Sequence, residues 1–276
     1  MKHLLTVLFI FFVSAWAPAS ATDGLPGAEE YVRGDYYKAR TIARTANTSD
    51  GYANACQSGL VIGGFLETGD EAVAALHGAI SDCIKALELA PNHYLAKLSL
   101  SVALSFEGKR LKKIIYPKHA KALIEQLMQQ ENKNPIGFGA MGAWHSEISA
   151  AGFFARLLLG ARRKNAEFFY VRALELGVDD YALKLEHVKF LARGKKAERK
   201  QATKLAGELL ALPTDNAFDD MLKGRCRLLL DAIRVGKKRF IKQTLIDISA
   251  FKSIASFRKL KAYPLNKVNI LTLLKS

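Results

Sequence analysis

Apolar residues recur at three- and four-residue spacing along most of this chain, which is the pattern of amphipathic helices. No run alternates between apolar and polar residues as a half-buried strand would, and no hairpin signal occurs. Proline or glycine separates successive periodic stretches, for example at Pro91 and at Asn134-Pro135. The pattern therefore predicts an all-α chain built from separate helices.

The predicted helices follow one another with short turns between them. In the N-terminal half they span about 25–33, 34–46, 52–66, 71–89 and 94–106, and we expect Gly108 to end the last of these. The stretch 109–132 contains Pro117, which predicts either a kink there or a helix that begins near this proline. The remaining predicted helices span about 134–148, 151–162, 165–177, 179–191, 198–212 and 216–235, and 151–162 is interpreted as a linking helix.

Small residues suggest how these helices pack. Three of the helices carry two alanines seven positions apart on one face: Ala39 and Ala46, Ala79 and Ala86, and Ala166 and Ala173. The stretch 85–93 (Lys-Ala-Leu-Glu-Leu-Ala-Pro-Asn-His) then closes its helix with a proline, which resembles the end of a tetratricopeptide repeat (TPR). The predicted fold is a TPR-like α-α superhelix, a right-handed solenoid of about four to five helical pairs.

A superhelix of this type has a concave groove lined by the first helix of each pair. By the repeat register, Leu95, Leu98, Val102 and Ser105 are predicted to line it, which makes this part of the groove apolar. Such a surface suits the side chains of a bound peptide, a hydrophobic small molecule or the chain's own C-terminal helix.

The first residues have the pattern of a secretory signal. Lys2 and His3 precede an apolar run from Leu4 to Val13, and Ala19-Ser20-Ala21 fits the small-x-small cleavage rule. The run is shorter than the roughly 20 residues of a membrane span, although a retained anchor is the alternative. We therefore expect a signal peptide over 1–21, cleavage before Thr22 and a periplasmic mature protein.

Positive charge is concentrated near the C-terminus. Residues 194–276 hold 19 Lys and Arg against 7 Asp and Glu, which accounts for most of the net charge of +15. We therefore divide the mature chain into a repeat domain, 22–236, and a basic amphipathic helical segment, 237–276. In an exported protein, anionic lipid headgroups or an acidic envelope partner are better candidates than nucleic acid.

The basic segment has two faces. Lys237, Lys238, Arg239 and Lys242 are the predicted surface-binding residues. The apolar face comprises Ile241, Leu245, Ile248 and Phe251, and the alternative is that this face packs on the last repeat as its cap.

The three cysteines, Cys56, Cys83 and Cys226, are too few for a disulfide framework. Cys56 and Cys83 lie on successive predicted helices, so an oxidising compartment would allow a bond between them. Buried free thiols are the alternative.

Motifs for catalysis, cofactors or metals find poor support. Residues 137–142 match Gly-x-Gly-x-x-Gly, but no strand precedes them as a dinucleotide site requires, so we interpret these glycines as helix-packing residues. His145 and Glu147 are two positions apart and do not share a helix face, so His145 is interpreted as a packing residue. His119 and His187 have no metal-site spacing. The sequence predicts no enzyme, cofactor or metal.

One region resembles a known family. Gly142-Ala143-Trp144-His145-Ser146-Glu147-Ile148, followed by residues 157–160 and by the Ala166/Ala173 helix, is similar to the TPR domain of the regulator of microtubule dynamics family. The similarity covers about 91–177 and rests on packing residues. It implies a helical-repeat scaffold and does not imply microtubule binding.

The sequence thus predicts a non-enzymatic periplasmic scaffold or adaptor that binds a protein or peptide partner in its concave groove. The alternative is a carrier of a hydrophobic small ligand or lipid for an envelope transport system. A closed apolar cavity in the superhelix would favour the carrier.

Overall fold

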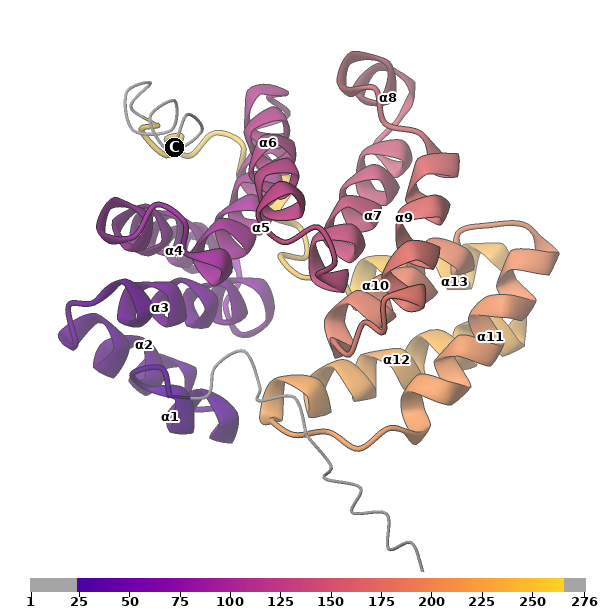
Figure 1. The fold of residues 1–276 in the computed structure, drawn as a ribbon. Coiled ribbons are helices and arrows are strands. Elements are labelled where there is room, and N and C mark those ends of the chain that lie inside the picture. The colour runs from indigo at the N-terminus through magenta and orange to yellow at the C-terminus, as the bar shows by residue number, and fades with distance from the viewer. Residues whose placement is uncertain (1–23, 266–276) are drawn as a thin grey trace, which may run out of the picture.

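The computed structural model describes residues 24–265 of the 276-residue chain, and this part consists of thirteen α-helices and short helical turns with no strand (Figure 1). The predicted all-α class is therefore confirmed. The predicted signal peptide 1–21, its cleavage site and the last eleven residues of the basic segment, 266–276, lie outside the described residues. No helix within 24–265 is both long and apolar enough to cross a bilayer.

Six helices form the N-terminal half. They are α1 (Ala28–Arg33), α2 (Tyr36–Thr45), α3 (Ser49–Val61), α4 (Gly69–Leu89), α5 (Tyr94–Leu111) and α6 (Ile115–Gln130). A π-helical turn, Ile62–Leu66, extends α3.

Seven helices form the C-terminal half. They are α7 (Pro135–Ala150), α8 (Phe153–Leu159), α9 (Arg163–Glu175), α10 (Tyr181–Ala192), α11 (Lys196–Ala211), α12 (Ala217–Val235) and α13 (Lys238–Asp247). Side-chain caps explain several starts: Asn134, Asp180 and Asn216 each accept a hydrogen bond from a backbone N–H of the first turn.

The prediction that Gly108 ends a helix is wrong. Helix α5 continues to Leu111, and Gly108 is buried inside it. A Cβ at Gly108 would lie 2.6 Å from Cδ of Pro117, so this glycine allows α6 to pack closely against α5. Pro117 lies in the first turn of α6, which confirms the alternative of a helix beginning near this proline.

The predicted alanine positions are buried in two of the three pairs. Ala79 and Ala86 on α4 are fully buried. On α9, Ala166 is fully buried and Ala173 is 2% exposed. Ala39 is buried too, but Ala46 caps α2 and is exposed, and the buried partner of Ala39 is Ala43. The two buried alanines of α2 are therefore four residues apart, because the helix ends at Thr45, before the predicted second position at Ala46.

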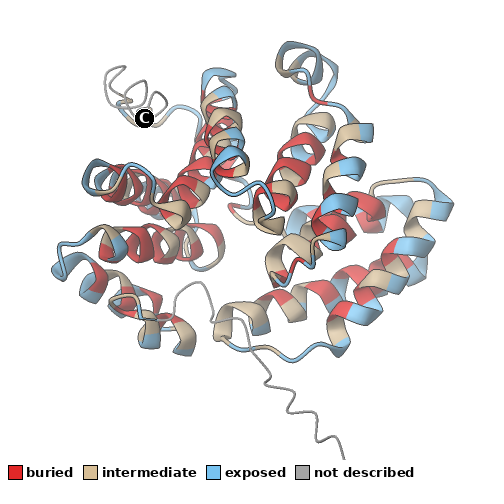
Figure 2. Cartoon of the chain, in the orientation of Figure 1, coloured by how far each residue is buried: buried red, intermediate tan, exposed pale blue. Residues whose placement is uncertain are grey.

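Most consecutive helices pack side by side, whereas α9 and α10 both pack on α7, and the inward faces of the helices are buried (Figure 2). One hydrophobic cluster lies mainly within α3–α7 and a second within α9–α13. A third cluster joins the two ends of the chain, because Tyr31 and Tyr36 pack with Phe218 and Met221 of α12. The N-terminal helices therefore contact the C-terminal half directly.

The structure decides between a disulfide and free thiols for Cys56 and Cys83. Cys56 on α3 and Cys83 on α4 form a disulfide with their Cα atoms 5.2 Å apart, and both are fully buried. Cys226 is a buried free thiol. The bond closes a loop of 27 residues, which in a chain-entropy description is worth about 3–4 kcal/mol of stability.

The apolar face of the basic segment is buried inside the molecule. Ile241, Leu245 and Ile248 join the cluster of α9–α13. Residues 248–265, called the C-terminal segment below, then run back onto α4 and α5 (Figure 1). Its Phe251 packs on Phe106 with ring centroids 4.6 Å apart. The structure thus favours the alternative of a cap.

A buried ion pair fastens the C-terminal segment to α5. Glu107 and Arg110 are both completely buried and hydrogen-bonded to each other. Arg110 also donates to the backbone carbonyls of Phe257, Leu260 and Lys261 at 2.8–3.1 Å. The backbone N–H of Tyr263 donates to Glu107 at 3.0 Å. One Arg–Glu pair therefore holds a stretch of chain about 150 residues away in sequence.

Candidate functional site

The four predicted groove residues lie on α5 and differ in exposure. Leu95 and Leu98 are half-buried and pack against the core. Ser105 donates a hydrogen bond to the carbonyl of Ser101, and Val102 is 39% exposed. Phe106 is four residues after Val102, so it shares that face of α5, and Phe251 packs on it. The C-terminal segment therefore lies against one end of this face, but it follows α13 and is not the C-terminal helix that was predicted as a possible occupant.

The four predicted surface-binding residues are all exposed at the start of α13. Lys237, Lys238, Arg239 and Lys242 have no ion pair with any residue in 24–265. Of these four, Lys238 alone lines a hollow that it shares with the basic side chains described next.

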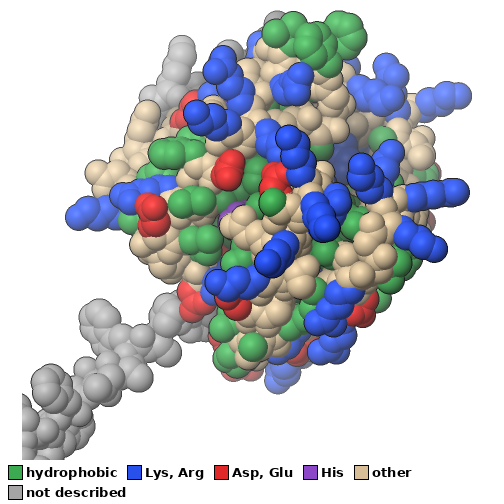
Figure 3. All heavy atoms as spheres, turned by 90° about the vertical axis from the view of Figure 1, so that its right-hand side faces the viewer, with side chains coloured by type: hydrophobic (Ala, Val, Ile, Leu, Met, Phe, Trp, Pro, Cys, Tyr) green, Lys and Arg blue, Asp and Glu red, His purple; other side chains and the backbone are tan. Residues whose placement is uncertain are grey.

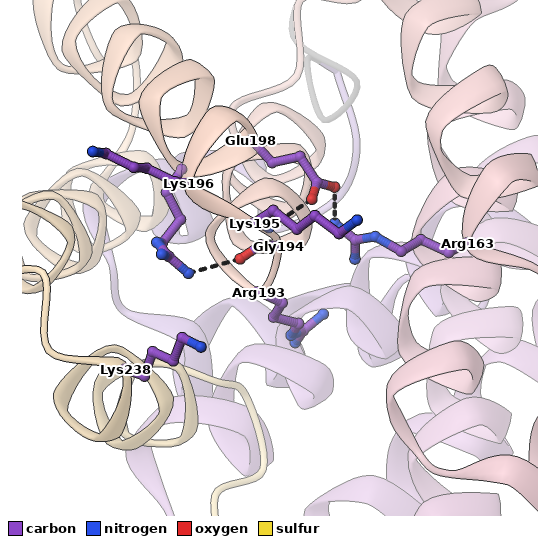
Figure 4. A pocket seen from close by; sticks show the side chains of 8 residues that line it. Arg163, Arg193, Gly194, Lys195, Lys196, Glu198 and Lys238 are labelled. Carbon is purple, nitrogen blue, oxygen red and sulfur yellow. Dashed lines mark hydrogen bonds and ion pairs between the residues drawn. The ribbon is translucent and has the colours of Figure 1, made fainter.

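This hollow, which we call the basic hollow, has a volume of about 460 Å³ and is open to solvent. Its lining combines the turn before α11 with the starts of α9, α11 and α13: Arg163, Arg193, Gly194, Lys195, Lys196, Glu198, Arg199 and Lys238. Figure 4 shows Lys238 reaching toward the Arg193–Gly194 turn from one side and Arg163 reaching in from the other.

The single carboxylate of the basic hollow is already occupied. Glu198 pairs with Arg163 and accepts a hydrogen bond from the backbone N–H of Lys195 at 2.6 Å. Burial raises the pKa of Glu198, but the contacts with Arg163 and Lys195 outweigh it and lower the pKa overall. Arg193 pairs with Glu147, which lies outside the lining. The hollow therefore keeps a surplus of positive charge.

A second feature is the apolar tip, which we define as Phe153, Phe154, Leu157 and Leu158 of α8. Their exposed fractions are 61%, 77%, 66% and 58%, and no residue of α8 is buried. Among the described helices, α8 packs appreciably only on α7. Figure 1 shows α8 standing at one end of the molecule, away from both halves of the core. Monomeric soluble proteins seldom expose large apolar side chains in a contiguous group.

The two glycines at the ends of α8 explain why the side chains of the apolar tip project together into solvent. Gly152 and Gly160 bound α8 with φ values of 120° and 65°, which only glycine adopts at little cost. The chain therefore turns sharply into and out of a helix of seven residues. This helix has no polar face to present to water except Arg156, whose guanidinium lies 5.6 Å from the Phe153 ring centre.

Basic side chains lie next to the apolar tip in the sequence and on the same face of the molecule. Residues 150–174 contain five Lys and Arg and one acidic residue. Arg156, Arg162, Lys164 and Arg172 are exposed. Figure 3 shows hydrophobic side chains gathered at the top of this face, where α8 lies, and Lys and Arg side chains spread below them. The apolar tip and the basic surface therefore face solvent on the same side.

The prediction of a linking helix at 151–162 missed the apolar tip. The observed helix is shorter, Phe153–Leu159. Its sequence signal is an apolar run interrupted only by Arg156, bounded by two glycines and followed by Arg162-Arg163-Lys164. A run of this kind without a polar face differs from the amphipathic pattern of the other helices.

The motif glycines pack helices, as interpreted from the sequence. A Cβ at Gly137, Gly139 or Gly142 would lie within about 3 Å of Met128, Leu183 or Tyr170 respectively. His145 stacks on Phe169, and burial lowers its pKa to about 4. Within the described residues, no three His, Cys, Asp or Glu side chains are grouped as metal ligands.

Two hollows within 24–265 differ from the closed apolar cavity that would favour the predicted carrier. The basic hollow is charged, and a second hollow of about 530 Å³ on α12 includes Arg225, Arg227 and Asp231. Both are open to solvent, whereas a hydrophobic ligand needs an enclosed apolar chamber.

Comparison with known proteins finds no family model and no curated protein that matches this chain. The functional argument therefore rests on the geometry of the apolar tip and the basic hollow.

Proposed function

We propose that this protein is a non-enzymatic helical scaffold of the bacterial envelope that docks on an anionic membrane surface through the apolar tip of α8. The observation that carries the proposal is the exposure of all four large apolar side chains of the tip. In this proposal the helical repeats are free to bind a protein or peptide partner, as predicted from the sequence.

The apolar tip has enough exposed surface to bind a bilayer. Complete burial of a Leu or Phe side chain is worth about 1.5–3 kcal/mol. Because each of the four side chains is more than half exposed, their insertion would contribute about 4–8 kcal/mol. Each exposed basic residue near an anionic bilayer adds about 1 kcal/mol. With three such residues the sum is about 7–11 kcal/mol, which corresponds to reversible binding of a peripheral protein with a dissociation constant from about 10 μM to about 10 nM.

Charge favours a lipid surface over another occupant. Arg156, Arg162 and Lys164 border the tip, so headgroup phosphates would meet them as the Phe and Leu side chains enter the acyl region. A second copy of this chain would bring the same positive charge against them, which costs free energy. An anionic bilayer is therefore the occupant that satisfies both the apolar and the basic side chains.

Other features support the scaffold and its location. A buried Cys56–Cys83 disulfide persists in an oxidising compartment such as the periplasm. The buried alanine pairs on α4 and α9 support the TPR-like, right-handed superhelix and the similarity to the regulator of microtubule dynamics family.

Vesicle flotation of the chain that starts at Thr22 tests this function. We expect it to float with vesicles containing anionic phosphatidylglycerol and to bind zwitterionic vesicles more weakly. Salt at about 1 M should weaken the binding without abolishing it, because screening removes the charge contribution and leaves the apolar one. A protein that stays at the bottom of the gradient with both vesicle types would contradict the proposal.

A further inference from the structure

The basic hollow lies where three helices begin. Arg163, Lys196 and Lys238 are the first residues of α9, α11 and α13, and all three line the hollow. The first N–H groups of a helix lack partners within it, and the helix dipole places about half a positive charge there. Six basic side chains, from these three helix starts and the turn before α11, therefore line one concave surface.

Three of its cations, Lys196, Arg199 and Lys238, have no carboxylate partner among residues 24–265. Among the described residues, the ammonium groups of Lys196 and Lys238 make no ion pair and no hydrogen bond. Arg199 donates to the carbonyl of Gly194 at 2.8 Å and has no carboxylate partner in 24–265. Glu198 is held by Arg163 and Lys195, so it does not neutralise these three side chains.

We propose that the basic hollow binds a phosphate group. Phosphate oxygens point in several directions, so one group can accept hydrogen bonds from side chains that come from different helices. Lys238 approaches from α13, whereas Lys196 and Arg199 belong to α11. A volume of about 460 Å³ admits the phosphate together with the start of the group that carries it.

The position of the hollow links it to the membrane. Gly160 ends α8 and Arg163 lines the hollow, so at most about 11 Å of chain separates the helix of the apolar tip from the hollow. A lipid headgroup bound there would fix how the tip enters the bilayer. The inference that the phosphate belongs to a lipid headgroup rests on the membrane function proposed above. The inference that the hollow binds a phosphate group does not depend on that function.

Two double variants with equal charge change test the proposal. The hollow variant is Lys196→Gln with Lys238→Gln. The control is Lys133→Gln with Lys200→Gln, which are exposed, make no ion pair within 24–265, do not line the hollow and are not among the predicted surface-binding residues. Far-ultraviolet circular dichroism should be the same for both, since all four side chains are exposed.

Each variant is measured with inorganic phosphate by calorimetry and with vesicles containing phosphatidic acid. Both measurements use about 0.5 M NaCl, where general charge attraction is screened within about 4 Å. The hollow variant should lose at least about tenfold in affinity in both measurements, because it lacks two charge-assisted hydrogen bonds. The control should change less than about threefold.

The outcomes separate the two sources of phosphate. A loss with inorganic phosphate alone, and equal vesicle binding by both variants, would assign the hollow to a soluble phosphate compound and overturn the headgroup. Equal behaviour of the two variants in both measurements, or no phosphate binding by the parent, would overturn the proposal. If the parent protein does not bind vesicles but binds inorganic phosphate, and the hollow variant loses that phosphate binding, the phosphate site stands and the membrane function is rejected.

Discussion

Replacing Arg110 with methionine should lower the free energy of unfolding by about 3–5 kcal/mol. Methionine fills part of the space, but Glu107 is then left buried without its main counter-charge. The carbonyls of Phe257, Leu260 and Lys261 also lose their donor. Urea denaturation at neutral pH measures the difference, and limited proteolysis should cut the C-terminal segment first because Arg110 holds it in place.

The pH dependence identifies the cause of this loss. Burial raises the pKa of Glu107, but hydrogen bonds from Arg110, His77 and Tyr263 outweigh it and lower the pKa to about 2. A carboxyl whose pKa is lowered on folding adds stability above its unfolded pKa, about 4.3. This contribution is lost as the pH falls toward 2. The Arg110→Met variant should therefore differ less from the parent near pH 3 than at pH 7.

Two controls accompany Arg110→Met. Arg172→Met removes an exposed arginine that pairs with Glu175 at the same i,i+3 spacing, and should change stability by less than about 1 kcal/mol. Adding Glu107→Gln to Arg110→Met removes the unpaired charge and should recover part of the loss. If Arg110→Met and Arg172→Met were equally stable, the buried pair would not fasten the C-terminal segment.

Replacing all four residues of the apolar tip with serine should weaken binding to anionic vesicles by at least about 100-fold. The change removes the apolar contribution of about 4–8 kcal/mol and leaves the basic side chains. Because no residue of α8 is buried, thermal stability should stay nearly unchanged. Flotation at a series of lipid concentrations gives the two affinities.

A matched control uses four other exposed apolar residues. Leu66, Leu89, Leu228 and Val235 are each about half exposed and lie outside α8. Their replacement by serine should leave vesicle binding within about threefold of the parent, since scattered apolar residues form no common surface. An equal loss in both variants would mean that general hydrophobicity, and not α8, holds the protein on the vesicle.

Local sequence signals predicted most helices, because helix starts and stops depend on nearby residues. Asn134-Pro135 and Pro91 mark observed boundaries, since their effects act within one turn. Gly108 misled the prediction because its role depends on Pro117 of the next helix and not on its own turn. The disulfide stayed open because sequence spacing cannot show whether two Cα atoms lie 5.2 Å apart.

The candidate sites were harder to predict because they depend on contacts between distant residues. The basic hollow joins positions 163, 196 and 238, which have no common local pattern. The sequence left two roles open for the apolar face of α13, a binding surface or a cap, and only the structure shows that Ile241 and Leu245 are buried within the protein. The residues of α8 look equally apolar, and only the structure shows that they stay exposed, because α8 packs appreciably on α7 alone among the described helices.

Insertion of α8 into a bilayer is the central claim, and the fluorescence of a Phe154→Trp variant tests it most directly. The chain from Thr22 has one other tryptophan, Trp144, which is buried and hydrogen-bonded to the carbonyl of Pro117, so its emission provides a constant background. On addition of phosphatidylglycerol vesicles, the emission of the introduced tryptophan should shift to shorter wavelength and be quenched by lipids brominated on their acyl chains. Unchanged emission under conditions where the same protein floats with the vesicles would contradict the claim, because the tip would then remain in water.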